Sequence, residues 1–124
     1  MYEVLAMVKP DALFTPDDME SMLRKICTAS GRELMRSGPA FTIRAEDAEL
    51  RIFCRSGPDV VEESNDMAEY FGIPCEDCAA RYEISGDDFN MVLLNGYILI
   101  NEWLQETKRF VLFDSQQGKL LFDD

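Results

Sequence analysis

The sequence FTIRAEDAELRIFCR, residues 41–55, decides the predicted fold because it places two short strands next to each other in the middle of the chain. Its β-branched and aromatic residues fall into two runs, residues 41–44 and 50–55, on either side of an acidic turn. Such residues favour strands, and two runs joined by a polar turn are typical of a β-hairpin. The elements on each side of this hairpin therefore set the topology.

Before the hairpin, the sequence predicts one strand and one helix. Residues 2–8 are almost continuously apolar, as in a strand that is buried on both faces. Thr15 then supplies an N-cap hydroxyl, followed by proline and two acidic residues in the first helical turn, and Gly31 supplies a stop. The residues at helical spacing that we expect to be buried are Met19, Met22, Leu23, Ile26 and Cys27.

After the hairpin, a second helix and a further strand follow. Gly57 and Pro58 end the hairpin, residues 59–71 form the predicted helix, and Gly72 closes it. Alternation over residues 78–84 predicts a strand. The order strand, helix, strand, strand, helix, strand is typical of the ferredoxin-like (split βαβ) fold, an antiparallel sheet with helices on one face. We therefore expect a single compact α+β domain over residues 1–124.

Residues 87–106 allow two interpretations. Asn95-Gly96 between apolar runs is a hairpin signal, whereas Asp87 and Asp88 before Phe89 resemble a helix cap. The apolar residues fit a helical stripe better than a strand alternation, at a cost of about 1 kcal/mol for an interior glycine. We favour a buried helix, with the hairpin as the alternative. The remaining C-terminal residues predict a hairpin around a turn at residues 115–118.

The composition indicates one hydrophobic core and a reduced environment. The chain has 124 residues, of which 47% are hydrophobic, and no apolar window long enough to cross a membrane. It does not begin with a basic and then apolar leader, so we expect a soluble, cytoplasmic protein. A core of this size does not require disulfides, and we expect the four cysteines to be free.

The charge is strongly acidic. Twelve basic and 24 acidic residues give a net charge of −12, which disfavours direct contact with nucleic acid or an anionic membrane and favours a basic protein partner. The chain contains no histidine, the residue that most often acts as a general base near neutral pH. We therefore expect no catalytic residue, no metal site and no cofactor.

The acidic residues are concentrated in one segment. Residues 56–88 contain ten acidic residues and Arg81 alone as a base, a net charge of −9. At about 100° per residue, the acidic residues of the second helix fall within an arc of roughly 120°, opposite Val60 and Ala68. The predicted partner-binding residues, called the acidic surface below, are Asp59, Glu62, Glu63, Asp66, Glu69, Glu76 and Asp77. A face that only increases solubility is the alternative interpretation.

The stretch AMVKPDAL, residues 6–13, resembles the first strand and following turn of nucleoside diphosphate kinases. The resemblance covers about ten residues and implies that Lys9 contacts phosphates. Those enzymes use a histidine nucleophile, and this chain has none, nor a glycine-rich phosphate loop. We therefore reject kinase activity and expect Pro10 to end a strand.

Cys75 and Cys78 form a C-x-x-C pair, which can be a redox centre or half of a zinc site. Glu76 and Asp77 lie between them and should raise the pKa of both thiols, which disfavours thiolate chemistry. A zinc site would also need Cys27 and Cys54, which belong to separate predicted elements. We favour a structural role for this turn.

These features predict a non-enzymatic acidic binding protein, most concretely an immunity or inhibitor protein that covers the basic active-site surface of a toxin or nuclease. Glu62, Asp66 and Glu69 would then stand in for phosphate groups. A secretion chaperone for an exported effector is the closest alternative, and a thiol-dependent or nucleotide-dependent enzyme is the more distant one. The protein could be a monomer or a homodimer, and a chaperone should be a dimer.

Overall fold

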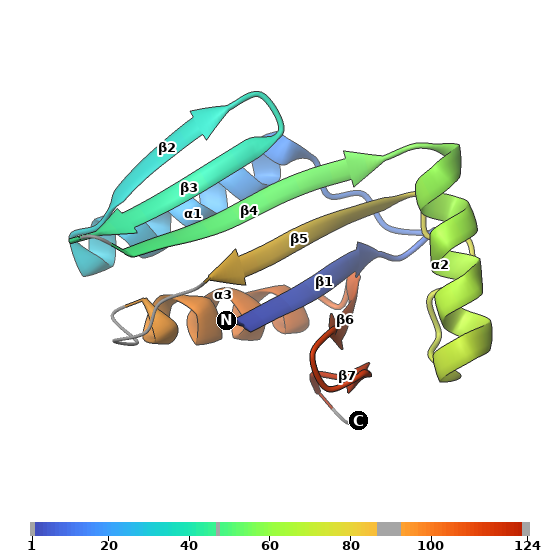
Figure 1. Ribbon diagram of the computed structural model, residues 1–124. Coiled ribbons are helices and arrows are strands. Elements are labelled where there is room, and N and C mark those ends of the chain that lie inside the picture. Colours follow the sequence, from blue (N-terminus) through green and yellow to red (C-terminus); the bar gives the residue numbers. More distant parts are fainter. Residues whose placement is uncertain (1, 47, 87–92, 123–124) are drawn as a thin grey trace.

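The computed structural model describes residues 2–46, 48–86 and 93–122, and these residues form an antiparallel sheet of seven strands with three helices (Figure 1). The α+β class is therefore confirmed. The strands are β1 (Tyr2–Val8), β2 (Glu33–Ser37), β3 (Ala40–Ala45), β4 (Ala48–Ser56), β5 (Ala80–Gly86), β6 (Phe110–Asp114) and β7 (Lys119–Leu120). The helices are α1 (Pro16–Ser30), α2 (Pro58–Phe71) and α3 (Leu94–Thr107).

The strand order is β2-β3-β4-β5-β1-β6-β7. The predicted hairpin is confirmed as β3 and β4, which pair from Ala40 with Phe53 to Ala45 with Ala48. Strands β4 and β5 also pair antiparallel, and Ser56 at the end of β4 lies opposite Ala80 at the start of β5. Residues 57–79, which include α2, are therefore a long insertion at the end of a β4–β5 hairpin.

This order contradicts the predicted ferredoxin-like topology. In a split βαβ unit a helix joins two parallel strands that have another strand between them, whereas α2 joins β4 and β5, which are direct antiparallel neighbours. A split unit does occur, but α3 forms it: α3 joins β5 to β6, and both strands pair antiparallel with β1 between them. All strands except β2 were predicted, and so were the β3–β4 and β6–β7 pairings, whereas the place of β5 between β4 and β1 was not.

Helices α1 and α3 cover one face of the sheet and enclose the main core (Figure 1). The five residues of α1 predicted to be buried are all buried. The cap is also confirmed, because the Asp18 backbone N–H donates to Thr15 Oγ1 at 3.2 Å and the Thr15 N–H donates to Asp18 Oδ2 at 2.8 Å. Helix α1 therefore starts where its sequence signal places it.

Helix α3 decides between the two interpretations of residues 87–106. Asn95 and Gly96 lie in its first turn, so the hairpin alternative is wrong for this part of the chain. The predicted cap at Asp87 and Asp88 lies outside the described residues. Helix α3 buries Tyr97, Ile100, Asn101 and Leu104, and its three large apolar side chains add more apolar area to the main core than the small residues that α2 buries could supply.

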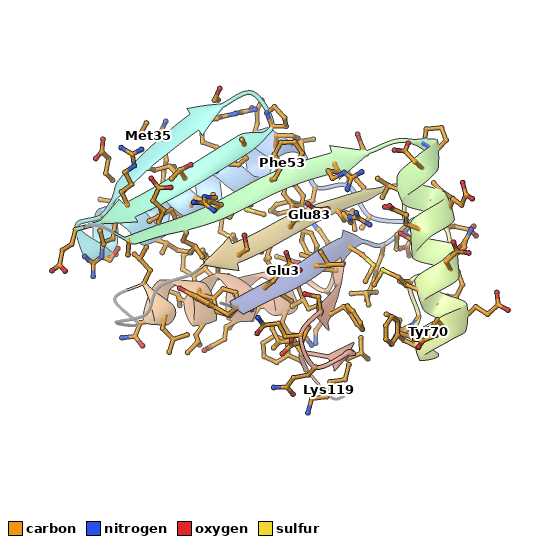
Figure 2. All side chains as sticks on the ribbon, in the orientation of Figure 1. Glu3, Met35, Phe53, Tyr70, Glu83 and Lys119 are labelled. Atoms are coloured by element: carbon orange, nitrogen blue, oxygen red, sulfur yellow. The ribbon has the colours of Figure 1, made fainter. Side chains whose placement is uncertain are left out.

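Helix α2 lies across one end of the sheet (Figure 1). With residues 73–78 it covers a second, smaller cluster on the other face, where Met7, Val111 and Phe113 are buried. No other helix of the described residues covers that face, and Phe53 and Met35 remain about two-fifths exposed on it (Figure 2).

Two smaller features complete the fold. The sequence analysis did not predict β2, an edge strand in which most residues are exposed, because it has no apolar alternation. The predicted C-terminal hairpin is confirmed as β6 and β7, and Asp114 Oδ1 accepts hydrogen bonds from the backbone N–H groups of Gln116 and Gln117 in its turn. No helix among the described residues is long and apolar enough to span a membrane.

Candidate protein-binding surface on the second helix

The ends of α2 are set by glycine and proline. Gly57 precedes the helix with a φ of 126°, a conformation that residues with a Cβ rarely adopt, and Pro58 occupies the first helical position. At the other end Gly72 has a φ of 67°, and its N–H donates to the Ala68 carbonyl at 3.0 Å. The predicted helix and its C-terminal stop are therefore confirmed.

One narrow stripe of α2 faces the protein. Val60, Ser64 and Ala68 are buried and recur every four residues, so the stripe follows one side of the helix. The predicted arc opposite them is solvent-exposed, as are the two acidic residues of the C-x-x-C turn. All seven residues of the acidic surface are therefore exposed: Asp59, Glu62, Glu63, Asp66, Glu69, Glu76 and Asp77.

Glu63 differs from the other members of the acidic surface because it takes part in holding α2 to the sheet. Its carboxylate lies 2.8 Å from Arg81 Nη1. The Arg81 side chain is only 8% exposed and also contacts Glu83 at 2.9 Å, which in turn lies 3.3 Å from Arg55. Glu63 is therefore engaged within the fold, unlike Glu62 beside it.

The other six carboxylates of the acidic surface have no ion-pair partner within 4.0 Å among the described residues. Two of them, Glu76 and Asp77, lie close to the helix because Asn65 Oδ1 accepts a hydrogen bond from the Asp77 backbone N–H at 2.8 Å. The structure thus brings the helix and the turn together as one acidic region. Like charges at this density repel one another, and a basic partner would relieve that repulsion.

An exposed aromatic pair lies at the C-terminal end of α2. Tyr70 is 82% exposed and Phe71 is 40% exposed, and their ring centroids are 4.7 Å apart. Phe71 also packs on Phe113 at 4.8 Å, which fixes the pair to the sheet. With Asp66, Met67 and Glu69, these rings line an open hollow of about 650 Å³.

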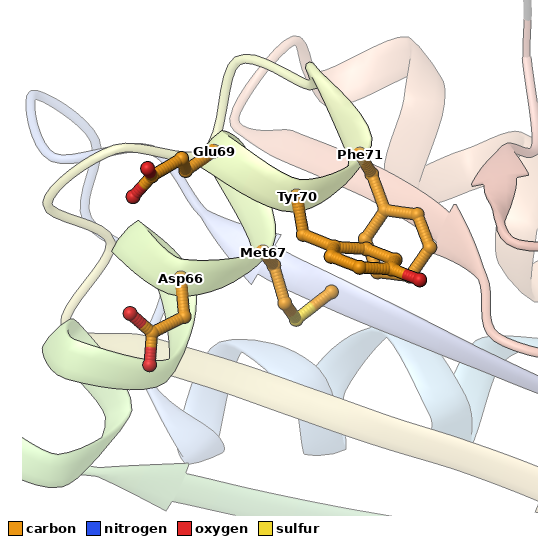
Figure 3. Close-up of a pocket in the computed structure, with 5 residues that line it drawn as sticks. All are labelled: Asp66, Met67, Glu69, Tyr70 and Phe71. Carbon is orange, nitrogen blue, oxygen red and sulfur yellow. The ribbon is translucent and has the colours of Figure 1, made fainter.

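Figure 3 shows the arrangement of these side chains: the Asp66 and Glu69 carboxylates lie on one flank of the helix, and the two rings lie on the other, with Met67 between them. A partner that approaches this end of α2 would meet carboxylates and aromatic rings together. The sequence analysis missed Tyr70, although at 100° per residue it falls inside the carboxylate arc. Phe71, the last residue of the helix, is also partly exposed.

The C-x-x-C pair is buried. Cys75 and Cys78 are both inaccessible to solvent, and the Cys75 thiol donates to the Ser64 carbonyl at 3.1 Å. Burial, reinforced by the charge of Glu76, raises the pKa of each thiol to about 11. Protonated, inaccessible thiols are poor nucleophiles, so this geometry favours the structural interpretation.

The four cysteines do not converge on one point. Cys27 belongs to the main core and Cys54 packs against it, whereas Cys75 and Cys78 belong to the second cluster on the opposite face of the sheet. Within the described residues, no group of three or more histidine, cysteine or acidic side chains is placed to hold a metal ion. The zinc alternative therefore has no geometric support.

Lys9 lies where β1 ends, and its backbone N–H donates to the Arg109 carbonyl at 2.8 Å. Its side chain lines a cavity whose lining contains no residue of the acidic surface. Strand β1 therefore ends at Val8, just before the turn that contains Pro10, as expected from that proline.

Comparisons of this chain with protein-family models, with curated proteins and with solved structures give no match. The interpretation of the acidic surface therefore depends on its geometry and charge.

Proposed function

We propose that this protein is a non-enzymatic binding protein that captures a basic protein partner through the acidic surface. In the most concrete version it is an immunity or inhibitor protein that occludes the basic active-site groove of a toxin or nuclease. The observation that carries the proposal is the exposed Tyr70 beside unpaired carboxylates on α2. Tyrosine is enriched among the residues that dominate binding energy at protein interfaces, and carboxylates accelerate association with a basic partner.

The arrangement of the carboxylates is consistent with the version with a nuclease. Glu62, Asp66 and Glu69 follow one another by four and three residues, about 6 Å and 4.5 Å along the helix axis, and they lie within one arc of the helix. A row of carboxylates on one face presents a single sign of charge to a basic groove, as the phosphates of a nucleic acid strand do.

The first experiment identifies the partner and then measures its affinity. Tagged protein is incubated with native lysate at low and at high salt, and a basic protein that is released by salt is identified by mass spectrometry. The purified partner is then titrated with the wild type and with the Glu62→Lys, Asp66→Lys, Glu69→Lys triple variant. We expect the triple variant to lose capture and to retain its circular dichroism spectrum, because none of the three side chains is buried.

A second triple variant separates the surface from the net charge. Asp11, Glu102 and Glu106 are exposed acidic residues outside α2, and their replacement by lysine changes the net charge by the same amount. This control should retain most of the affinity at physiological salt, since exposed charges beyond a Debye length are largely screened. Equal losses in the two triple variants, or unchanged affinity in the first, would contradict the proposal.

Tyr70 provides a test that does not change the charge. Tyr70→Ala should weaken binding by about 2 kcal/mol, the threshold for an interface hot spot. Leu13→Ala is the matched control, because Leu13 is similarly exposed and lies outside α2. If the captured partner is an enzyme, saturating amounts of wild type should inhibit it, and the triple variant should not.

A further inference from the structure

A second candidate site is a cavity beside β6 whose charged residues are basic. The cavity has a volume of about 240 Å³, and two lysines, Lys9 and Lys108, belong to its lining. The rest of the lining is mainly apolar and includes Phe110, Leu112, Leu120 and Phe122. An apolar cavity with a few polar groups is the usual form of a small-molecule site.

The strand register sets which backbone groups of β6 face away from β1. The Lys9 N–H donates to the Arg109 carbonyl, so the next pair, Val8 and Phe110, is a non-hydrogen-bonded pair. The N–H and C=O of Phe110 therefore point to the outer edge of the sheet. At that edge β7 pairs with Phe113 and Asp114, and the Leu121 N–H donates to the Leu112 carbonyl at 2.9 Å.

Among the residues that the structure describes, no acidic side chain forms an ion pair with the lysines of the cavity. Lys9 and Lys108 have no ion-pair partner within 4.0 Å in residues 2–46, 48–86 and 93–122, although acidic residues outnumber basic residues two to one in the chain. Arg109, next to Lys108, donates to the Leu13 carbonyl at 3.3 Å and does not belong to the lining. Two positive charges at one cavity repel each other and attract an anion.

We propose that this cavity binds a small organic carboxylate with an apolar body. The carboxylate lies between the Lys9 and Lys108 ammonium groups, and the apolar body packs on Phe110, Leu112, Leu120 and Phe122. The cavity is smaller than the range of about 300–1,000 Å³ that holds drug-sized ligands, which limits the ligand to a short aliphatic or aryl acid. Its apolar walls also disfavour a nucleotide, whose sugar and phosphates need polar contacts. The proposal is independent of the acidic surface.

The test is a titration of ¹⁵N-labelled protein with octanoate, followed by nuclear magnetic resonance. We expect saturable shifts centred on the backbone amides of Lys9, Lys108 and Phe110. Lys9→Ala and Lys108→Ala should each raise the dissociation constant by about fivefold or more, the effect of losing one unit charge at 4 Å in water. Octanol, which has the same chain length without the charge, should bind correspondingly more weakly.

Lys119→Ala is the matched control, because it removes one positive charge from an exposed residue of β7 that does not line the cavity. It should leave the octanoate affinity unchanged. The titration is repeated with the Asp123→Asn, Asp124→Asn variant, because two carboxylates follow the lining residue Phe122 in the sequence. The proposal would be overturned if neither protein showed saturable shifts up to about 10 mM octanoate. Such a result would mean a binding free energy weaker than about 3 kcal/mol. An equal loss of affinity in Lys119→Ala and Lys9→Ala would overturn it too.

Discussion

Arg81 and Glu63 form an ion pair of 2.8 Å that joins β5 to α2. Arg81 is almost completely buried, and it also bonds to Glu83 on its own strand, so one guanidinium holds two carboxylates. The only base in the most acidic segment of the chain is therefore used to attach the acidic helix to the sheet. This contact explains why α2 can present its other carboxylates to solvent and still remain fixed.

We expect Arg81→Met to lower the free energy of unfolding by about 2 kcal/mol, because hydrogen bonds to charged groups contribute roughly 1.5–3 kcal/mol. Glu63→Gln should cost less, about 1 kcal/mol at most, because the Glu63 side chain is 46% exposed and water screens the pair. Urea denaturation followed by circular dichroism measures both values. Arg44→Met is the control, because Arg44 pairs with Glu49 in a more exposed position, and its effect should be close to zero. An equal effect of Arg44→Met and Arg81→Met would contradict this account.

The two buried thiols should make stability depend on pH at alkaline values. Burial raises their pKa to about 11 in the folded protein from the ordinary thiol value of 9.0. Above pH 9 the unfolded chain loses these protons before the folded protein does, so the thiol contribution is complete below pH 9 and is lost as the pH rises toward 11. The stability difference between the wild type and Cys75→Ala, Cys78→Ala should therefore shrink over this range. A constant difference in urea midpoints would show that the thiols are not buried as described.

The same burial predicts slow thiol modification. At pH 8 a disulfide reagent should react with native Cys75 and Cys78 only at the rate of local opening, and rapidly after denaturation. Mass spectrometry of the labelled peptides separates the two from Cys54, which is partly exposed and serves as the internal reference. Labelling of Cys75 or Cys78 ahead of Cys54 would revive the redox interpretation.

The cap of α1 offers a local test. Thr15→Ala removes the side-chain acceptor for the Asp18 N–H and should lower the free energy of unfolding by about 1 kcal/mol. Thr15→Ser retains the hydroxyl and should cost much less. Thermal or urea unfolding of the two variants gives the comparison, and equal losses would mean that the methyl group rather than the cap is responsible.

Gly86 lies against the ring of Tyr2. A Cβ at this position would lie 2.7 Å from three atoms of the phenol, so Gly86→Ala must displace the ring, which packs on Tyr97 at a centroid distance of 4.4 Å. We expect a loss of about 1–3 kcal/mol, as for other overpacked sites. In Tyr2→Leu the same glycine replacement should cost clearly less, and a double-mutant cycle measures the coupling. Additive effects would show that the close approach is absent in solution.

Local sequence signals predicted most elements of the fold. The cap at Thr15, the apolar spacing of α1, the hairpin of β3 and β4, and the glycine at the end of α2 all act over a few residues, so their physical effect is contained in the sequence nearby. Strand β2 was not predicted, because an edge strand with exposed residues has no hydrophobic pattern. The choice for residues 94–107 was correct because helical spacing outweighed the Asn95-Gly96 signal.

In the candidate sites, too, local features were predictable from the sequence and contacts between distant segments were not. The arc of carboxylates on α2 was predictable from helical periodicity, and the structure places all of them at the surface. The ion pair between Glu63 and Arg81 was not predictable from the sequence, and neither was the presence of Lys9 and Lys108 in one cavity. Each of them joins elements that are far apart in the chain. Only the pairing of β1 with β6 brings those two lysines to one cavity.

The sequence by itself determined the α+β class, the position of the main elements and the acidic arc, because these depend on periodicity and on caps within one segment. The tertiary structure alone decided that β5 lies between β4 and β1, that α3 rather than α2 covers the main core, and that residues 57–79 form an insertion at one end of the sheet. Strand order depends on pairings between segments that are far apart in the chain, such as those of β1 with both β5 and β6. These contacts exist only in the folded protein, so no local pattern in the sequence contains them.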